Sequence, residues 1–162
     1  MVRRCRRLTR ARERGIIEVM TQIEFYEVRG PRWQHALCAQ VESLYAAGQR
    51  VYVLAEAEPG ARHLDELLWT FRDDSFVPHG LWQGEAGVDE PVAVGWQEGN
   101  PNGAQCLMLA RGAPPARVDG FRRVLDLAPV DVPELRDAAR ERFRAFQALG
   151  LAPVFHRAAA TP

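Results

Sequence analysis

Residues 64–79 read LDELLWTFRDDSFVPH, and the organisation of the whole chain can be worked out from this stretch. Apolar side chains recur at positions i, i+3, i+4 and i+7 of its first half, which is the spacing of one helix face: Leu64, Leu67, Leu68 and Phe71. Trp69 falls outside that stripe, so the spacing predicts a large aromatic side chain at the rim of the buried face. Pro78 favours an extended conformation at Val77, so the segment after the helix leaves as extended chain.

Upstream of this helix the sequence has the rhythm of a β-α-β unit. Residues 23–28 alternate as a strand does, residues 33–47 have helical spacing and end before Gly48, and residues 50–55 form a short apolar run typical of a buried parallel strand. Pro59 and Gly60 then predict a turn into the helix that contains Leu64. This order of elements indicates right-handed crossovers on a parallel sheet.

Downstream, shorter segments continue the pattern. Strands are predicted at 91–96, 105–110 and 123–127, a short helix at 116–122, and a long final helix from about 131 to Gly150. The predicted fold is a single α/β domain with a Rossmann-like, mostly parallel sheet flanked by helices. The chain contains neither GxxxxGK[ST] nor GxGxxG after its first strand, so this fold carries no predicted nucleotide site.

The charge of the chain is unevenly distributed. Residues 1–19 contain seven arginines against Glu13 and Glu18, while the chain as a whole has 21 basic and 21 acidic side chains. We expect 1–19 to be a disordered basic extension, and Met20 is a candidate for the true start. Residues 20–152 are then the α/β domain and 153–162 a C-terminal tail. The basic arm also leaves open an alternative function, a nucleic-acid-binding module.

No catalytic constellation is recognisable in the sequence. The four histidines lack metal-ligand spacing, and Cys5, Cys38 and Cys106 form neither a disulfide framework nor a CxxC motif, which is typical of a reducing cytoplasm. No apolar run approaches the length of a membrane span, and no signal peptide is evident. We therefore predict a cytoplasmic, non-enzymatic protein with no cofactor and no bound metal.

The final helix has one face that combines charge with an aromatic ring. Arg136, Arg140 and Phe143 lie at i, i+4 and i+7, beside a buried stripe that includes Phe146. This pattern is compatible with an anion-binding surface. It is equally compatible with a solvated charged face, because Asp137 and Glu141 could pair with the two arginines.

Four segments, in this order, resemble the chi subunit family of bacterial DNA polymerase III: LDELLWTF, DDSFVPHGL, PVAVGW and ARERFRAFQALG. The resemblance extends from about Ile23 to Gly150. It implies a non-catalytic accessory subunit for DNA replication, one that links the clamp loader, through the psi subunit, to the C-terminal tail of single-stranded DNA-binding protein. That tail is acidic and ends in a hydrophobic residue. Association with DNA would then be indirect, through single-stranded DNA-binding protein.

The resemblance also implies which residues bind these partners. The tail would lie in one groove between the helix that contains Leu64 and the final helix. The residues that would form this groove are Trp69, Ala128, Arg136, Arg140 and Phe143. Arg136 stands where a lysine is found in relatives, and Ala128 is smaller than a typical pocket wall. For psi, the candidates are Phe76, Val77, His79 and Trp82. The alternative for this second group is that it packs in the core.

Overall fold

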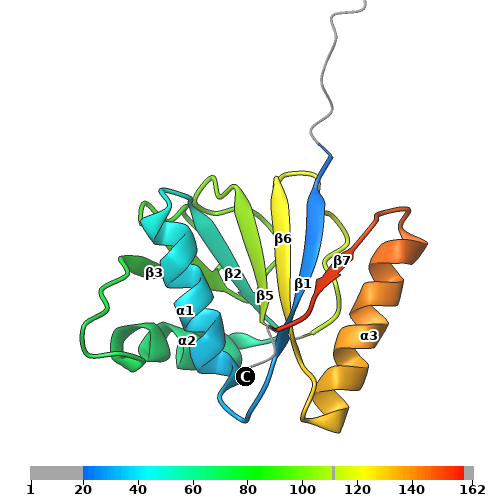
Figure 1. Ribbon diagram of the computed structural model, residues 1–162. Coiled ribbons are helices and arrows are strands. Elements are labelled where there is room, and N and C mark those ends of the chain that lie inside the picture. Colours follow the sequence, from blue (N-terminus) through cyan, green and yellow to red (C-terminus); the bar gives the residue numbers. More distant parts are fainter. Residues whose placement is uncertain (1–19, 111, 159–162) are drawn as a thin grey trace, which may run out of the picture.

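A computed structural model describes residues 20–110 and 112–158 of the chain (Figure 1). The predicted basic extension at 1–19 lies outside the described residues. Helices and strands alternate along most of the chain, in the order β1 (Gln22–Val28), α1 (Trp33–Ala46), β2 (Val51–Ala55), α2 (Glu58–Thr70), β3 (His79–Trp82), β4 (Val92–Gly95), β5 (Cys106–Ala110), β6 (Arg123–Pro129), α3 (Pro133–Ala148) and β7 (Val154–His156).

The strands of the described residues form one seven-stranded sheet in the order β3-β4-β2-β5-β6-β1-β7, and every neighbouring pair is parallel. The predicted single α/β domain is therefore confirmed, with an all-parallel sheet. Strands β2, β4 and β5 are buried along their whole length. Their near-continuous apolar sequences follow from this, since a central parallel strand is covered on both faces.

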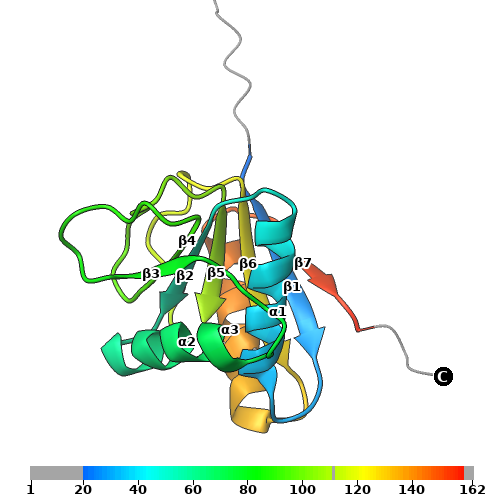
Figure 2. The same ribbon diagram turned by 90° about the vertical axis from the view of Figure 1, so that its left-hand side faces the viewer.

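The strand order explains which face each helix covers. The connections β1-α1-β2 and β2-α2-β3 both run toward the β3 edge, whereas β6-α3-β7 runs toward the β7 edge. Right-handed crossovers in opposite directions place their helices on opposite faces of a sheet. Accordingly α1 and α2 cover one face and α3 covers the other, which Figure 2 shows with α3 behind the sheet.

Three local predictions differ from the structure. Helix α2 begins at Glu58, so Pro59 and Gly60 lie inside its first turn and not in a preceding turn, because proline tolerates the start of a helix. Residues 116–122 form a loop and not a helix; Val118 and Phe121 from this loop are buried on the α3 face, where they belong to the same apolar cluster as Phe146 of α3.

The third difference concerns the end of the chain. Strand β7 lies in the stretch expected to be a tail, yet it pairs with β1 from Val154 to His156.

None of the helices in the described part of the chain has the length and apolar character of a membrane span.

Candidate functional site

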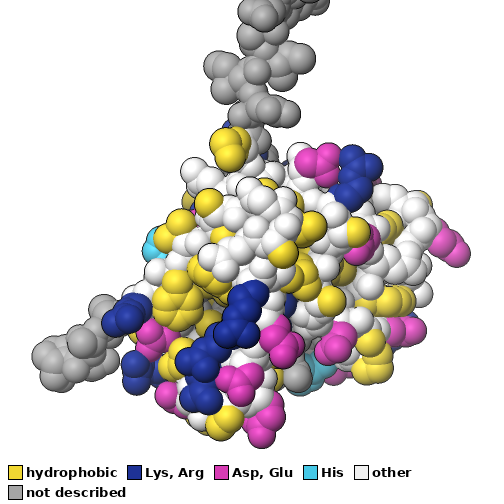
Figure 3. All heavy atoms as spheres, turned by 90° about the vertical axis from the view of Figure 1, so that its right-hand side faces the viewer, with side chains coloured by type: hydrophobic (Ala, Val, Ile, Leu, Met, Phe, Trp, Pro, Cys, Tyr) yellow, Lys and Arg dark blue, Asp and Glu magenta, His cyan; other side chains and the backbone are white. Residues whose placement is uncertain are grey.

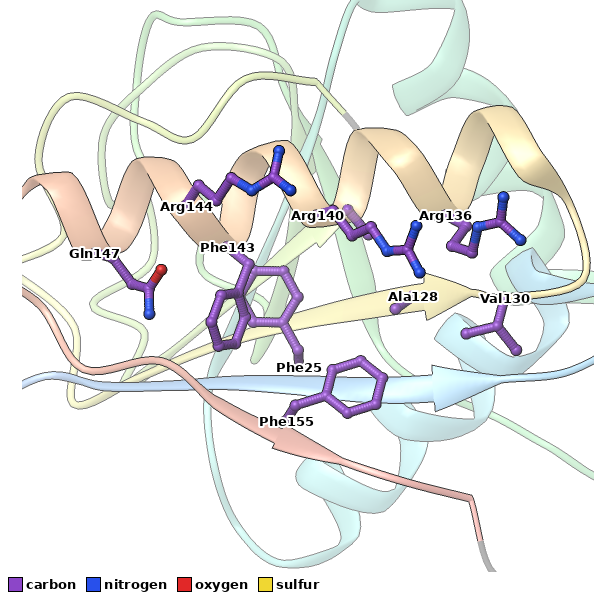
Figure 4. A pocket seen from close by; sticks show the side chains of 10 residues that line it. Phe25, Ala128, Val130, Arg136, Arg140, Phe143, Arg144, Gln147 and Phe155 are labelled. Atoms are coloured by element: carbon purple, nitrogen blue, oxygen red, sulfur yellow. The ribbon is translucent and has the colours of Figure 1, made fainter.

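A pocket of about 440 Å³ lies on the α3 face, between that helix and the strands β6, β1 and β7. Figure 4 shows side chains from all four elements pointing toward it. Most of its lining comes from α3, and the complete set is Phe25, Ala128, Val130, Arg136, Ala139, Arg140, Phe143, Arg144, Gln147 and Phe155.

The floor of the pocket is apolar. Phe25 is fully buried, and its ring meets that of Phe143 edge-to-face, with the ring centroids 5.2 Å apart. Ala128 is also buried, and because its side chain is a single methyl group it leaves room above β6. Of the residues predicted to bind the tail, the structure therefore brings together Ala128, Arg136, Arg140 and Phe143.

The rim of the pocket is basic. Arg136, Arg140 and Arg144 follow each other at every fourth position, so one side of α3 carries a row of guanidinium groups. In Figure 3, which views the molecule from the α3 side, basic side chains form such a group beside apolar ones. A guanidinium group offers a planar fork of donors to a carboxylate, and an apolar floor beside it suits an uncharged side chain. Arg144 was not among the predicted site residues, although its spacing from Arg140 was visible in the sequence.

Trp69 does not belong to this pocket. It lies on α2, which covers the opposite face of the sheet, where its ring contacts Phe76 at 5.7 Å and His79 at 4.5 Å between centroids. The prediction that Trp69 shares one groove with Arg136, Arg140 and Phe143 is wrong. Its failure has a topological cause, since the crossovers that place α2 and α3 run in opposite directions.

The residues predicted to meet psi separate into exposed and buried ones. Phe76 is 68% exposed and Trp69 is 53% exposed, so together they form an aromatic surface, here called the Trp69–Phe76 patch. Val77 is in the core, and His79 is buried with its ring nitrogens near the backbone oxygens of Val77 (2.6 Å) and Asp65 (2.9 Å). Val77 and His79 are therefore buried, as the alternative prediction of core packing expected.

Trp82 is also separated from the patch. It alternates on β3 toward the α3 face, where its half-buried ring packs edge-to-face against Tyr52 at 5.8 Å. It therefore lies on the other side of the sheet from Trp69 and Phe76.

Comparison with known proteins gives the family. Residues 20–154 match the family model for the DNA polymerase III chi subunit, HolC. The chain belongs to the DNA polymerase III chi subunit family. It is 34% identical over 142 residues to the DNA polymerase III subunit chi of Pseudomonas aeruginosa, covering 85% of this chain and 97% of that protein. It is 29% identical over 119 residues to the subunit chi of Escherichia coli, covering 72% and 80% of the two chains.

Family membership makes this chi-family chain a non-catalytic accessory subunit of DNA polymerase III. Two of its cysteines lie in the part of the chain that the structure describes. Cys38 and Cys106 are buried, and burial raises the pKa of Cys38 to about 12 and also raises that of Cys106. Both are therefore thiols at neutral pH, and neither is poised as a nucleophile.

A buried ion pair fixes α3 of the chi-family fold against the sheet. Arg142 donates to both carboxylate oxygens of Asp126, at 2.5 and 3.0 Å, and the two side chains are 6% and 1% exposed. Burial raises the pKa of Asp126, and the bidentate guanidinium opposes that rise. Sequence analysis did not identify this pair. The available signal was Asp126 itself, a carboxylate in the middle of an apolar strand, which needs a buried partner.

The basic rim is partly neutralised by one acidic residue. Asp137 Oδ1 lies 3.4 Å from Arg136 Nε and 3.4 Å from Arg140 Nη1, and all three side chains are at least partly exposed. The alternative prediction of a solvated charged face thus holds in part. Such exposed contacts stabilise weakly, so the two guanidinium groups can exchange Asp137 for another carboxylate at little cost.

Replacing Asp137 by asparagine is expected to strengthen the binding of an acidic peptide to this rim about two- to fivefold, the scale of an exposed ion pair. The substitution removes a competing negative charge and keeps the shape of the side chain. Calorimetric titration of a short acidic peptide into both proteins measures the change. Glu141→Gln is the control, because Glu141 is an exposed carboxylate of the same helix and, among the described residues, pairs with none of the rim arginines. Equal affinities of D137N and the unchanged protein would contradict the proposed competition.

Proposed function

We propose that this chi-family protein is an adaptor with two binding surfaces on opposite faces of its sheet. The arginine-rimmed pocket takes the C-terminal tail of single-stranded DNA-binding protein, and the Trp69–Phe76 patch takes the psi subunit of the clamp loader. The observation that carries the proposal is the pocket, where three guanidinium groups surround an apolar floor. This combination is complementary to a chain end that carries negative charge beside an apolar side chain.

The chemistry of the pocket divides the tail into two parts. The terminal carboxylate and the acidic side chains pair with the guanidinium groups of the rim, and the terminal apolar side chain enters the space above Ala128, against the paired rings of Phe25 and Phe143. Such a contact is smaller than a standard protein interface. We expect micromolar affinity, about −8 kcal/mol, with most of the specificity in the last residue.

The Trp69–Phe76 patch has the character of a second interface. Two large aromatic side chains are exposed next to each other, while the residues beneath them, Val77 and His79, are buried and hold the patch in place. Tryptophan is one of the residue types enriched among those that carry most of the binding energy at protein interfaces. Because this patch lies on the α2 face, a partner bound there leaves the pocket on the α3 face open.

Replacing Arg140 by alanine is expected to weaken the binding of a tail peptide by about 1–3 kcal/mol, the scale of a lost charge-assisted contact. Calorimetric titration of the peptide measures the loss. Arg62→Ala is the matched control, since Arg62 is an exposed arginine of α2 that pairs only locally, with Glu58. Unchanged affinity of R140A would remove Arg140 from the site.

The role of the tail itself is tested by a pull-down of single-stranded DNA-binding protein with this chain. The full-length partner is expected to be retained, and a partner that lacks its last few residues is expected to be lost. Retention of the shortened partner, or retention that requires added single-stranded DNA, would contradict a tail-binding pocket and favour the nucleic-acid-binding alternative.

A further inference from the structure

Strand β7 contributes a third phenylalanine to the pocket. Phe155 lies in register with Phe25 on the neighbouring strand β1, so the two side chains project from the same face of the sheet, toward α3. In Figure 4 the ring of Phe155 lies across the pocket from α3. Phe143, Phe25 and Phe155 thus form one wall, the floor and the opposite wall.

Phe155 is far more exposed to solvent than Phe25. Phe25 is fully buried by Phe143 and Phe146, at centroid distances of 5.2 and 6.2 Å, whereas Phe155 remains 42% exposed. A half-exposed ring at the edge of an apolar pocket gains contacts only when something fills the pocket.

The structure holds Phe155 in place from two sides. After α3, Gly150 adopts a positive φ of 78°, and Leu151 donates its backbone N–H to the oxygen of Phe146 at 3.1 Å, so the chain turns back tightly into β7. On the other face of the sheet, His156 stacks on Tyr26 with centroids 4.6 Å apart. The wall is therefore preorganised, even though β7 has only three residues and lies at the edge of the sheet.

We propose that Phe155 is a specificity-determining residue, one that makes the pocket select an aromatic side chain at the C-terminus of an acidic peptide. This inference rests on the proposed tail-binding function and refines it. The guanidinium groups of the rim recognise any chain end with a carboxylate, so they do not distinguish the last residue. Three phenylalanine rings do, because edge-to-face and stacked contacts favour a flat ring over a methyl group.

The test compares two synthetic acidic peptides that differ only in the last residue, phenylalanine or alanine, by calorimetric titration. For F155A we expect about tenfold weaker binding of the peptide ending in phenylalanine and a change below about twofold for the peptide ending in alanine. Val154→Ala is the matched control, because Val154 is an exposed residue of the same strand on the opposite face, and it should change neither affinity. Phe155→Leu keeps the strand filled without a ring and should recover only part of the preference.

The outcomes separate the inference from the function beneath it. If the unchanged protein prefers phenylalanine and F155A or F155L keeps that preference in full, Phe155 is not the discriminating residue and the inference is overturned. If F155A weakens both peptides equally, Phe155 acts by holding the pocket together, which also overturns it. If the unchanged protein binds neither peptide, the proposed function itself fails.

Discussion

Replacing Arg142 by methionine is expected to lower the free energy of unfolding by about 3–5 kcal/mol, the largest stability change we predict for this protein. Methionine fills much of the same volume, but it leaves the carboxylate of Asp126 buried without its bidentate partner. Chemical denaturation followed by circular dichroism measures the loss. Arg144→Met is the control on the same helix, and because Arg144 is exposed it should change stability by less than about 0.5 kcal/mol.

Two further results would show that the buried charge is the cause. The double variant D126L/R142M should recover a large part of the lost stability, since an apolar pair of similar volume carries no desolvation penalty. The deficit of R142M alone should shrink as the pH falls toward the ordinary carboxyl range, because the buried Asp126 takes up its proton above that range. Burial raises the pKa of Asp126 in the folded state, so the unpaired charge is costly above that raised pKa and disappears on protonation. A double variant no more stable than R142M would contradict this explanation.

Replacing Trp69 by alanine is expected to weaken association with psi by at least about 2 kcal/mol, roughly thirtyfold, while leaving the affinity for a tail peptide unchanged. The reason for the first effect is the loss of the larger of two adjacent exposed rings. The reason for the second is position, because Trp69 and the pocket lie on opposite faces of the sheet. Both affinities can be measured by calorimetry with purified psi and with the peptide.

Arg140→Ala provides the crossed control for this experiment. It should weaken the peptide and leave psi binding unchanged, which is the reverse of the pattern expected for W69A. If W69A and R140A both weakened the binding of the peptide, the two residues would act in one site, as the family resemblance implies. The proposal of two separate binding surfaces on opposite faces of the sheet would then be wrong.

Local spacing predicted much of this protein correctly. The helix stripe at Leu64, Leu68 and their neighbours placed α2, and the apolar runs at 50–55 and 105–110 placed two central strands. The group Arg136, Arg140 and Phe143 was also correct as a group, because residues at i, i+4 and i+7 share a helix face whatever surrounds the helix. In each case the deciding interaction lies within a few residues of sequence.

The errors have the opposite character. Whether Trp69 faces Arg140 depends on the order of strands in the sheet, and that order is set by long-range pairing that no local pattern reveals. The pair Asp126–Arg142 and the wall residue Phe155 depend on the same pairing, since β6 and β7 must both be placed before their side chains have neighbours. Family resemblance supplied candidate residues for the two surfaces, but it did not supply the face of the sheet on which each of them lies.

Strand β1 is paired with β6 on one side and with β7 on the other, and these two neighbours begin at Arg123 and Val154. During synthesis on the ribosome, the first strand must therefore wait for about a hundred further residues before either neighbour exists. A truncated translation product that ends before β6 has Phe25 but nothing to stand beside it. The pocket draws its lining from β1, β6, α3 and β7, so its walls are all present only after the last of these strands has been synthesised.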